Sequence, residues 1–157
     1  PILVQYDAHQ IDKIISRFIE QLPYCEGVNN HMGSLATTDE NVMNAVMAVL
    51  KKNNKFFLDS RTTNVSVAYS VAQKNHLKSY RNDLFFVFPN ISQSTMDAKL
   101  NQIIELSNLK QNVIAISHCH NYDKLDYLKR IINRLKAAGF TLIPLTDIDK
   151  YNVPEIL

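Results

Sequence analysis

The sequence predicts one α/β domain, residues 1–157, built on a parallel β-sheet. Short, continuously apolar runs, which are typical of strands buried on both faces, alternate with longer amphipathic segments, which are typical of helices. No linker, repeat or low-complexity tract interrupts this alternation. With 157 residues, of which 46% are hydrophobic, the chain is long enough to bury one ordinary core.

The first half of the chain contains three predicted helices. Residues 8–22 carry an apolar stripe at helical spacing, and Thr37-Thr38-Asp39-Glu40 has the pattern of a capping box that begins a second helix. A shorter amphipathic stretch follows from Val65. The residues expected to face the core are Ile11, Ile14, Ile15, Phe18, Ile19 and Leu22, then Val42, Met43, Val46, Val49 and Leu50, then Val65, Ala68, Val71 and Ala72.

The second half contains two more predicted helices. One begins at Ser94, with Asp97 three residues later, and the other ends near Gly139, where a left-handed C-terminal cap is expected. Their apolar faces are Met96, Leu100, Ile103, Ile104 and Leu109, and Leu125, Leu128, Ile131, Ile132 and Leu135.

Four apolar runs are predicted to be buried strands, because each is short and bounded by polar residues, glycine or proline. A fifth, weaker candidate has few apolar residues. The four runs are residues 56–58, 84–88, 113–116 and 141–143, and the weaker candidate is residues 25–29.

Polar side chains that can bind a metal ion or take part in catalysis follow directly after the predicted strands. In parallel α/β folds the carboxyl ends of the strands form the ligand site, and a cluster of His and Asp there suits a divalent metal ion. The residues concerned are Asn29-Asn30-His31, Asp59-Ser60-Arg61-Thr62-Thr63, His118-Cys119-His120 and Thr146-Asp147, while Arg81 and Asp83 precede the run at 84–88.

Each of these residues also has an ordinary structural interpretation. A histidine after a strand is often a solvated loop residue. Asp59 or Thr63 could cap a helix, and Arg81 and Asp83 could form a surface ion pair. Spacing alone therefore indicates a polar rim but no specific reaction.

Composition excludes few partners. The 17 basic and 15 acidic residues are interspersed, so the net charge of +2 gives no clustered basic face for nucleic acid. No apolar run is long enough to span a membrane. Cys25 and Cys119 form neither a CxxC motif nor a zinc-finger spacing, and no signal peptide is visible after Pro1.

Three motifs carry a resemblance to a known family. They are Gly27-Val28-Asn29-Asn30-His31-Met32-Gly33-Ser34, Phe57-Leu58-Asp59-Ser60-Arg61-Thr62-Thr63 and Ile114-Ala115-Ile116-Ser117-His118. The sequence resembles the divergent polysaccharide deacetylase family over residues 8–149. The resemblance implies a distorted, incomplete β/α barrel with a metal site at the carboxyl ends of the strands.

The implied reaction is metal-dependent hydrolysis of an acetyl group on a carbohydrate. A zinc ion would polarise the acyl carbonyl and its bound water, and a histidine would protonate the leaving group. Mapped by motif, the metal ligands are His31, Asp59 and His118; the catalytic residues are Asp59, Arg61 and His118; and the substrate-binding residues are Asn30, Ser60, Arg81 and Asp83. Gly33 would let the backbone turn behind His31.

Two departures bear on activity. The family's Asp-Asp pair on an early strand has no counterpart here, so we expect the first βα units to be missing. The segment Arg81-Asn82-Asp83 carries one residue more than the family pattern, which weakens the mapping of Asp83. Three interpretations stay open: a deacetylase, an inactive glycan- or metal-binding module, and a scaffold that forms homo-oligomers through exposed sheet edges. The resemblance implies a bacterial protein of the periplasm or another extracytoplasmic compartment.

Overall fold

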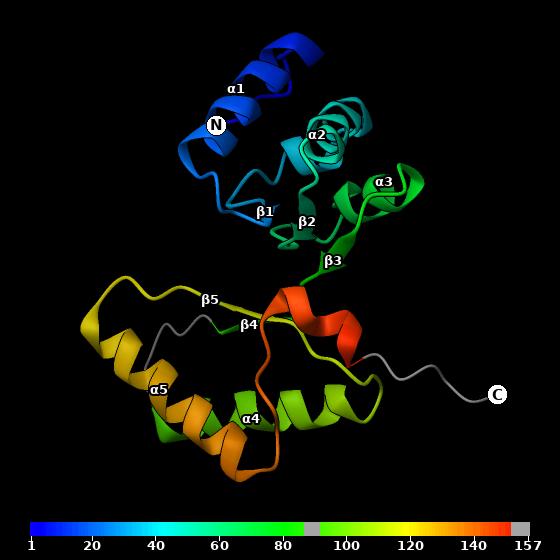
Figure 1. Ribbon diagram of the computed structural model, residues 1–157. Helices are drawn as coiled ribbons and strands as arrows, with labels where there is room; N and C mark the ends of the chain where they lie inside the picture. Colours follow the sequence, from blue (N-terminus) through cyan, green and yellow to red (C-terminus); the bar gives the residue numbers. More distant parts are fainter. Residues whose placement is uncertain (87–91, 152–157) are drawn as a thin grey trace, which may run out of the picture. The chain divides into compact units, whose positions relative to one another are not determined.

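The computed structural model describes residues 1–86 and 92–151. The chain divides into two compact units, Pro1–Asn82 and Asp83–Leu157, which are described separately below (Figure 1). The expectation of one domain over residues 1–157 stays a prediction. In the part of the chain that is described, no helix is long and apolar enough to cross a membrane.

The first unit is built on a three-stranded parallel sheet. Its order is β1 (Gly27–Asn29), β2 (Phe56–Asp59) and β3 (Ser79–Arg81), with β2 in the centre. Leu58 lies opposite Asn29 on one side and Tyr80 on the other. Because all three strands run in the same direction, the segments that follow Asn29, Asp59 and Arg81 leave the sheet at the same edge.

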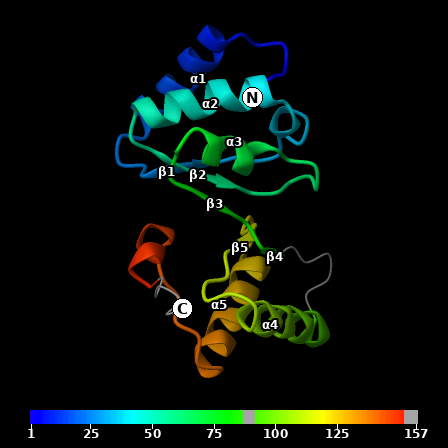
Figure 2. The ribbon, with the colours of Figure 1, turned by 90° about the vertical axis from the view of Figure 1, so that its right-hand side faces the viewer.

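Helices α2 (Glu40–Lys52) and α3 (Ala68–Lys74) pack on one face of this sheet, and α1 (Ala8–Gln21) packs against α2 on the side away from the sheet (Figure 2). Helix α1 begins at Asp7, whose carboxylate accepts the Gln10 N–H at 2.8 Å. Helix α2 begins at Asp39, whose side chain accepts two backbone N–H groups. A short 3-10 turn, η1 (Ala36–Thr38), precedes α2, and α3 follows β2.

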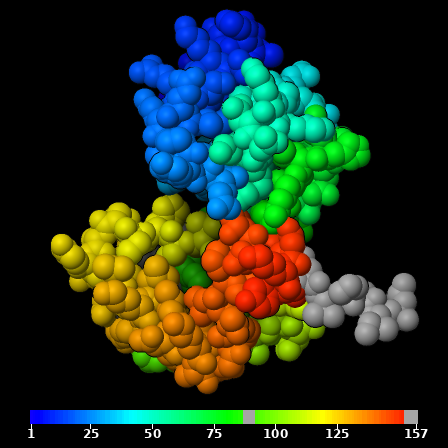
Figure 3. Space-filling model, in the orientation of Figure 1, coloured from blue at the N-terminus to red at the C-terminus, as the bar shows by residue number. Residues whose placement is uncertain are grey.

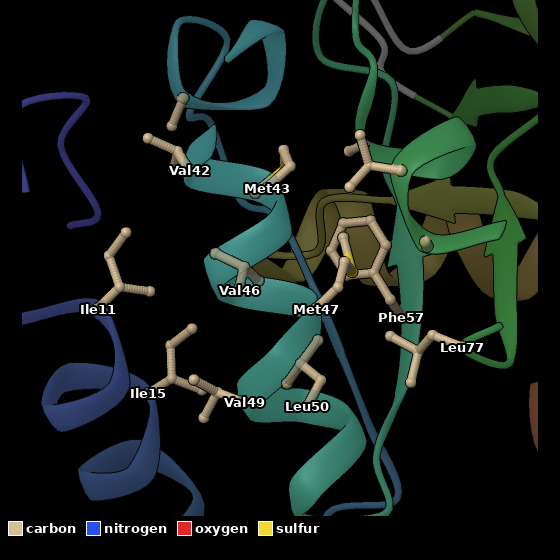
Figure 4. Close-up of a cluster of buried hydrophobic side chains, with 14 residues drawn as sticks. Ile11, Ile15, Val42, Met43, Val46, Met47, Val49, Leu50, Phe57 and Leu77 are labelled. Atoms are coloured by element: carbon tan, nitrogen blue, oxygen red, sulfur yellow. The ribbon is translucent and has the colours of Figure 1, made fainter. Parts of the chain in front are cut away.

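Helix α2 is the centre of the core because it is apolar on two sides (Figure 4). Ile11 and Ile15 of α1 face one side of α2, and Phe57 of β2 and Leu77 face the other. Met47 and Leu50 are fully buried. Burial of each such side chain contributes about 1.5–3 kcal/mol. The cluster therefore holds α1 against α2, and α2 and α3 against the sheet.

The glycine at the start of β1 is required by its neighbour in β2. A Cβ atom at Gly27 would lie 2.3 Å from the ring of Phe56, which is closer than any real contact. The Phe56 ring itself is held edge-on against Tyr80, with ring centroids 5.5 Å apart. Gly27 therefore leaves space for an aromatic ring on the face of the sheet opposite the helices.

The second unit pairs β4 (Leu84–Phe86) with β5 (Ala115–Ser117) in parallel. Its helices are α4 (Gln93–Ser107) and α5 (Tyr122–Ala137), followed by the 3-10 segment η2 (Leu145–Lys150). In the space-filling view of Figure 3, α5 is orange and η2 is red. The core consists of Phe86, Met96, Ile103, Tyr127, Ile131 and Leu135.

Two polar side chains of the second unit, Asp83 and Tyr127, have distinctive surroundings. Asp83 accepts the Lys110 ammonium at 2.6 Å and the Ile114 N–H at 2.8 Å, and so joins the start of β4 to the segment before β5. Burial raises the pKa of the Tyr127 phenol above its ordinary value, and the nearby Arg130 and Arg134 oppose that shift. The phenol is therefore neutral at neutral pH.

The α/β class with parallel βα units is confirmed, and the described residues form two partial sheets without a closed barrel. Several boundaries differ from prediction. Helix α2 begins at Asp39 and α4 at Ser92, because these side chains accept the exposed helix N–H groups. Val65 is exposed and precedes α3.

Two strand assignments were wrong. Residues 141–143 form no strand; Thr141 and Leu142 are exposed and pair with no other strand in the described ranges. Strand β3 was not predicted, since Tyr80 is its only apolar residue. Residues 87 and 88 of the predicted strand 84–88 lie outside the described residues.

Candidate functional site

Two loops leave the sheet of the first unit side by side, the first loop (residues 30–35) after β1 and the second loop (residues 60–67) after β2. The Asn30 side chain joins them with both ends of its amide. Its Oδ1 accepts the Ser60 N–H at 2.8 Å, and its Nδ2 donates to Thr62 Oγ1 at 3.3 Å. Asn30 was predicted to bind substrate; the structure places it between the loops.

Further hydrogen bonds converge on the carbonyl of Met32. Thr62 Oγ1 donates to Met32 O at 3.0 Å, and Asn30 Nδ2 also donates to it, at 3.4 Å. Asn30, Thr62 and Met32 thus form a closed triangle of hydrogen bonds. Because Met32 directly follows His31, this triangle fixes the backbone beside the exposed imidazole of His31.

Asp59, at the carboxyl end of β2, is only 1% exposed. Its Oδ1 accepts the Arg61 N–H at 2.8 Å, and its Oδ2 accepts the Ser66 hydroxyl at 2.9 Å. The carboxylate therefore holds the beginning and the end of the second loop together, because it accepts one hydrogen bond from each. Asp59 was predicted as a metal ligand and catalytic group, a role that stays a prediction; the contacts present are those of a residue that shapes the loop.

Backbone strain is found on both loops. Met32 has φ +57° and Arg61 has φ +53°, in the left-handed region that costs a residue with a Cβ atom roughly 1–2 kcal/mol. Gly33, with φ +72°, takes such a conformation without that cost. The sequence-based expectation that Gly33 permits a tight turn behind His31 agrees with this geometry. Strained residues of this kind gather at functional sites.

The end of β3 contributes a residue that sequence reasoning missed. Asn82 is buried, its N–H donates to Asp59 O at 2.8 Å, and its Nδ2 donates to Ser60 O at 3.3 Å. Its Oδ1 has no hydrogen-bond partner among the described residues. The signal that could have found it is its position, an amide side chain directly after a strand at the carboxyl edge of the sheet.

Ser60 is also buried, and its hydroxyl accepts Asn29 Nδ2 at 2.9 Å. Arg61 is exposed at the turn of the second loop. Arg81 places its guanidinium 5.5 Å from the centre of the Tyr69 ring, a cation–π contact. Asp83 forms an ion pair with Lys110, and an ion pair between Arg81 and Asp83 stays a prediction.

His118 belongs to the second unit, where it follows β5 and is exposed together with Cys119 and His120. Asp83 lies in the same unit at the start of β4. His31, Asp59 and Arg61 lie in the first unit. The structure thus brings together the residues of the two loops, and it places His118 and Asp83 in the other unit.

The donor set can be compared with what a divalent cation needs. Within residues 1–86 and 92–151, no three His, Cys, Asp or Glu side chains are grouped so that they could hold a metal ion. His31 fits the role of one ligand, since its imidazole is exposed on a fixed loop, whereas the Asp59 oxygens are buried and already bonded.

Comparison with known proteins identifies the scaffold on which these loops are carried. The model of the family described as divergent polysaccharide deacetylase matches residues 1–148. The chain belongs to the divergent polysaccharide deacetylase family. The resemblance noted at the three motifs is thereby confirmed.

Two relatives of this family member come from bacteria. The uncharacterized protein YibQ of Escherichia coli is 33% identical over 118 residues, which are 74% of this chain and 36% of YibQ. An uncharacterized protein of Haemophilus influenzae is 35% identical over 92 residues, 59% of this chain and 32% of the relative. The chain therefore spans about a third of the length of the curated relatives it matches.

A solved structure supports the fold. The crystal structure of the uncharacterized protein ATU2773 from Agrobacterium tumefaciens C58 matches this deacetylase-family chain with a TM-score of 0.76. The match covers 92% of this chain and 58% of that chain, at 14% sequence identity. At this identity the likeness establishes the fold alone.

Proposed function

We propose that this family member takes part in the hydrolytic removal of acetyl groups from a carbohydrate. The observation that carries the proposal is the arrangement of the two loops, in which Asn30 and Thr62 hold the backbone next to His31 at the carboxyl edge of a parallel sheet. This edge is where parallel α/β proteins bind their ligands. Family membership supplies the class of reaction.

In this proposal the exposed side chains act and the buried ones position them. Arg61 donates hydrogen bonds to an acyl or carboxylate oxygen, for which its planar, permanently charged guanidinium is suited. His118 has two alternative roles in this proposal, as the acid that protonates the leaving group or as a metal ligand. Asp59 holds the turn on which Arg61 stands, through the hydrogen bond to the Arg61 N–H. Arg81 remains a proposed substrate contact with its exposed side chain, and so does Asp83. Ser60, predicted as a substrate contact from the motifs, is buried and can take that role only if the second loop moves.

A zinc ion bound by His31 is part of the proposal. Asp59 and His118 are the further ligands predicted from the motifs. An ion of this kind, when bound, polarises the acyl carbonyl. The extracytoplasmic location and the homo-oligomer through sheet edges belong to the same set of proposals.

A second function is favoured by one observation. The Asp59 carboxylate is buried and accepts two hydrogen bonds, so it is not presented to a ligand in this conformation. A module that binds an acetylated glycan without hydrolysing it requires the exposed Arg61 and the fixed loops, but no carboxylate base. Turnover distinguishes this glycan-binding module from the deacetylase.

The proposal is tested by measuring acetate released from short N-acetylglucosamine oligomers in the presence of zinc. We expect turnover by the wild-type chain and a loss of at least about a hundredfold in His31→Ala, in line with the contribution of a catalytic group. His76→Ala is the matched control, because His76 is also an exposed histidine of the first unit. Oligomer binding without acetate release would instead support the glycan-binding module.

A further inference from the structure

Met32 combines three properties. It directly follows His31, its carbonyl oxygen is held by Thr62 and Asn30, and its side chain is 72% exposed. An exposed methionine by itself needs no explanation. Its position does, because the backbone at Met32 has φ +57°.

The other positive-φ residues give a basis for comparison. Asn54 and His76, with φ +54° and +53°, lie just beyond the ends of α2 and α3, where a left-handed residue ordinarily terminates a helix. Met32 and Arg61 instead lie in the loops after two neighbouring strands, joined through Thr62. Glycine would adopt this conformation without the cost that the Cβ atom imposes. The backbone therefore gives no reason for a large side chain at position 32.

We infer that the Met32 side chain is a substrate contact that receives the apolar part of an acetylated sugar. This inference rests on the proposed function. A thioether side chain is flexible and polarisable and adapts to irregular apolar surfaces, which suits either the acetyl methyl group or the C–H face of a sugar ring. Arg61, on the adjoining loop, would meet the polar groups of the same sugar, so the two exposed side chains form an apolar and a polar half of one recognition surface.

The inference predicts that stability and binding change in opposite directions. Met32→Gly relieves the backbone strain, and we expect its melting temperature to rise by about 2–4 °C. Met32→Ala keeps a Cβ atom and removes the rest of the side chain, so its melting temperature should stay within about 1 °C of the wild type. Both variants should bind short N-acetylglucosamine oligomers about tenfold more weakly, as expected for the loss of a partly buried apolar contact.

His76→Gly is the matched control, because it relieves the same backbone conformation at the end of α3. Its melting temperature should rise like that of Met32→Gly, with no change in oligomer affinity. A residue with only a structural role would not produce a variant that is more stable and yet binds less well. Glucosamine oligomers, which lack the acetyl group, distinguish the two contacts. If the Met32 variants bind only the acetylated oligomers more weakly, Met32 contacts the acetyl methyl group. If they bind both kinds of oligomer more weakly, Met32 contacts the sugar ring.

Two results would overturn the inference in distinguishable ways. If the wild-type chain binds the oligomers and both Met32 variants bind them with the wild-type dissociation constant, Met32 is no substrate contact while the proposed function stands. If the wild-type chain binds no acetylated oligomer at all, the proposed function fails and the inference fails with it.

Discussion

Replacement of Asp59 by alanine is expected to lower the free energy of unfolding of the first unit by about 3 kcal/mol. The substitution removes the acceptor of both the Arg61 N–H and the Ser66 hydroxyl, in a position that is 1% exposed. Leaving buried donors without partners costs about 1–3 kcal/mol for each group. Urea denaturation, followed by the amide NMR signals of α2, measures the change.

Asp12→Ala is the control for this experiment. Asp12 is a partly exposed acid of the same unit whose ion pair with Lys52 spans 3.8 Å, so its loss should cost at most about 1 kcal/mol. Asp59→Asn should fall between the two, because its amide can still accept the Arg61 N–H. Equal destabilisation by Asp59→Ala and Asp12→Ala would mean that the Asp59 carboxylate does not hold the second loop.

The second large effect is expected at Asn30, where aspartate should destabilise the first unit by about 2 kcal/mol. The change replaces the Nδ2 donor by an oxygen that faces Thr62 Oγ1 and the Met32 carbonyl, which are 3.3 and 3.4 Å away. The repulsion between the carboxylate and the Met32 carbonyl should open the triangle of hydrogen bonds. Amide exchange of residues 32–37 should become faster, while the Ser60 N–H keeps its acceptor.

The adjacent Asn29 provides a matched control. Its Nδ2 donates to Ser60 Oγ at 2.9 Å, and a hydroxyl can reverse its role and donate to a carboxylate. Asn29→Asp should therefore cost less than about 1 kcal/mol. The assignment of Asn30 as the residue that joins the loops would be refuted if the two aspartate variants had the same stability and the same amide exchange.

The helices and the central strand could be predicted from the sequence because their apolar residues repeat at a regular spacing. The stripe from Ile11 became α1, and the run at Phe56 became β2. Helix starts were predicted less well: α4 was expected to begin at Ser94, whereas the Ser92 side chain accepts the Thr95 N–H and caps the helix. Strand β3 carried too little apolar character to be recognised.

The candidate site was predicted only in part. The residues after β1 and β2 were correctly expected to leave the same edge of the sheet, since parallel strands require it. The sequence could not show that Asn30 and Ser60 bond to each other across the loops, because hydrogen bonds between residues 30 positions apart depend on the register of two strands. The burial of Asp59 has the same origin, as the Ser66 that bonds to it comes from the far end of the second loop.

The most direct test of His31 as a metal ligand is a calorimetric titration of zinc into the wild-type chain, His31→Ala and His76→Ala. We expect saturable binding by the wild type and by His76→Ala, and an affinity lower by at least about tenfold in His31→Ala, as for the loss of one ligand from a site. The proposal would be contradicted if the wild-type chain bound no zinc, or if His31→Ala bound it as tightly as the wild type.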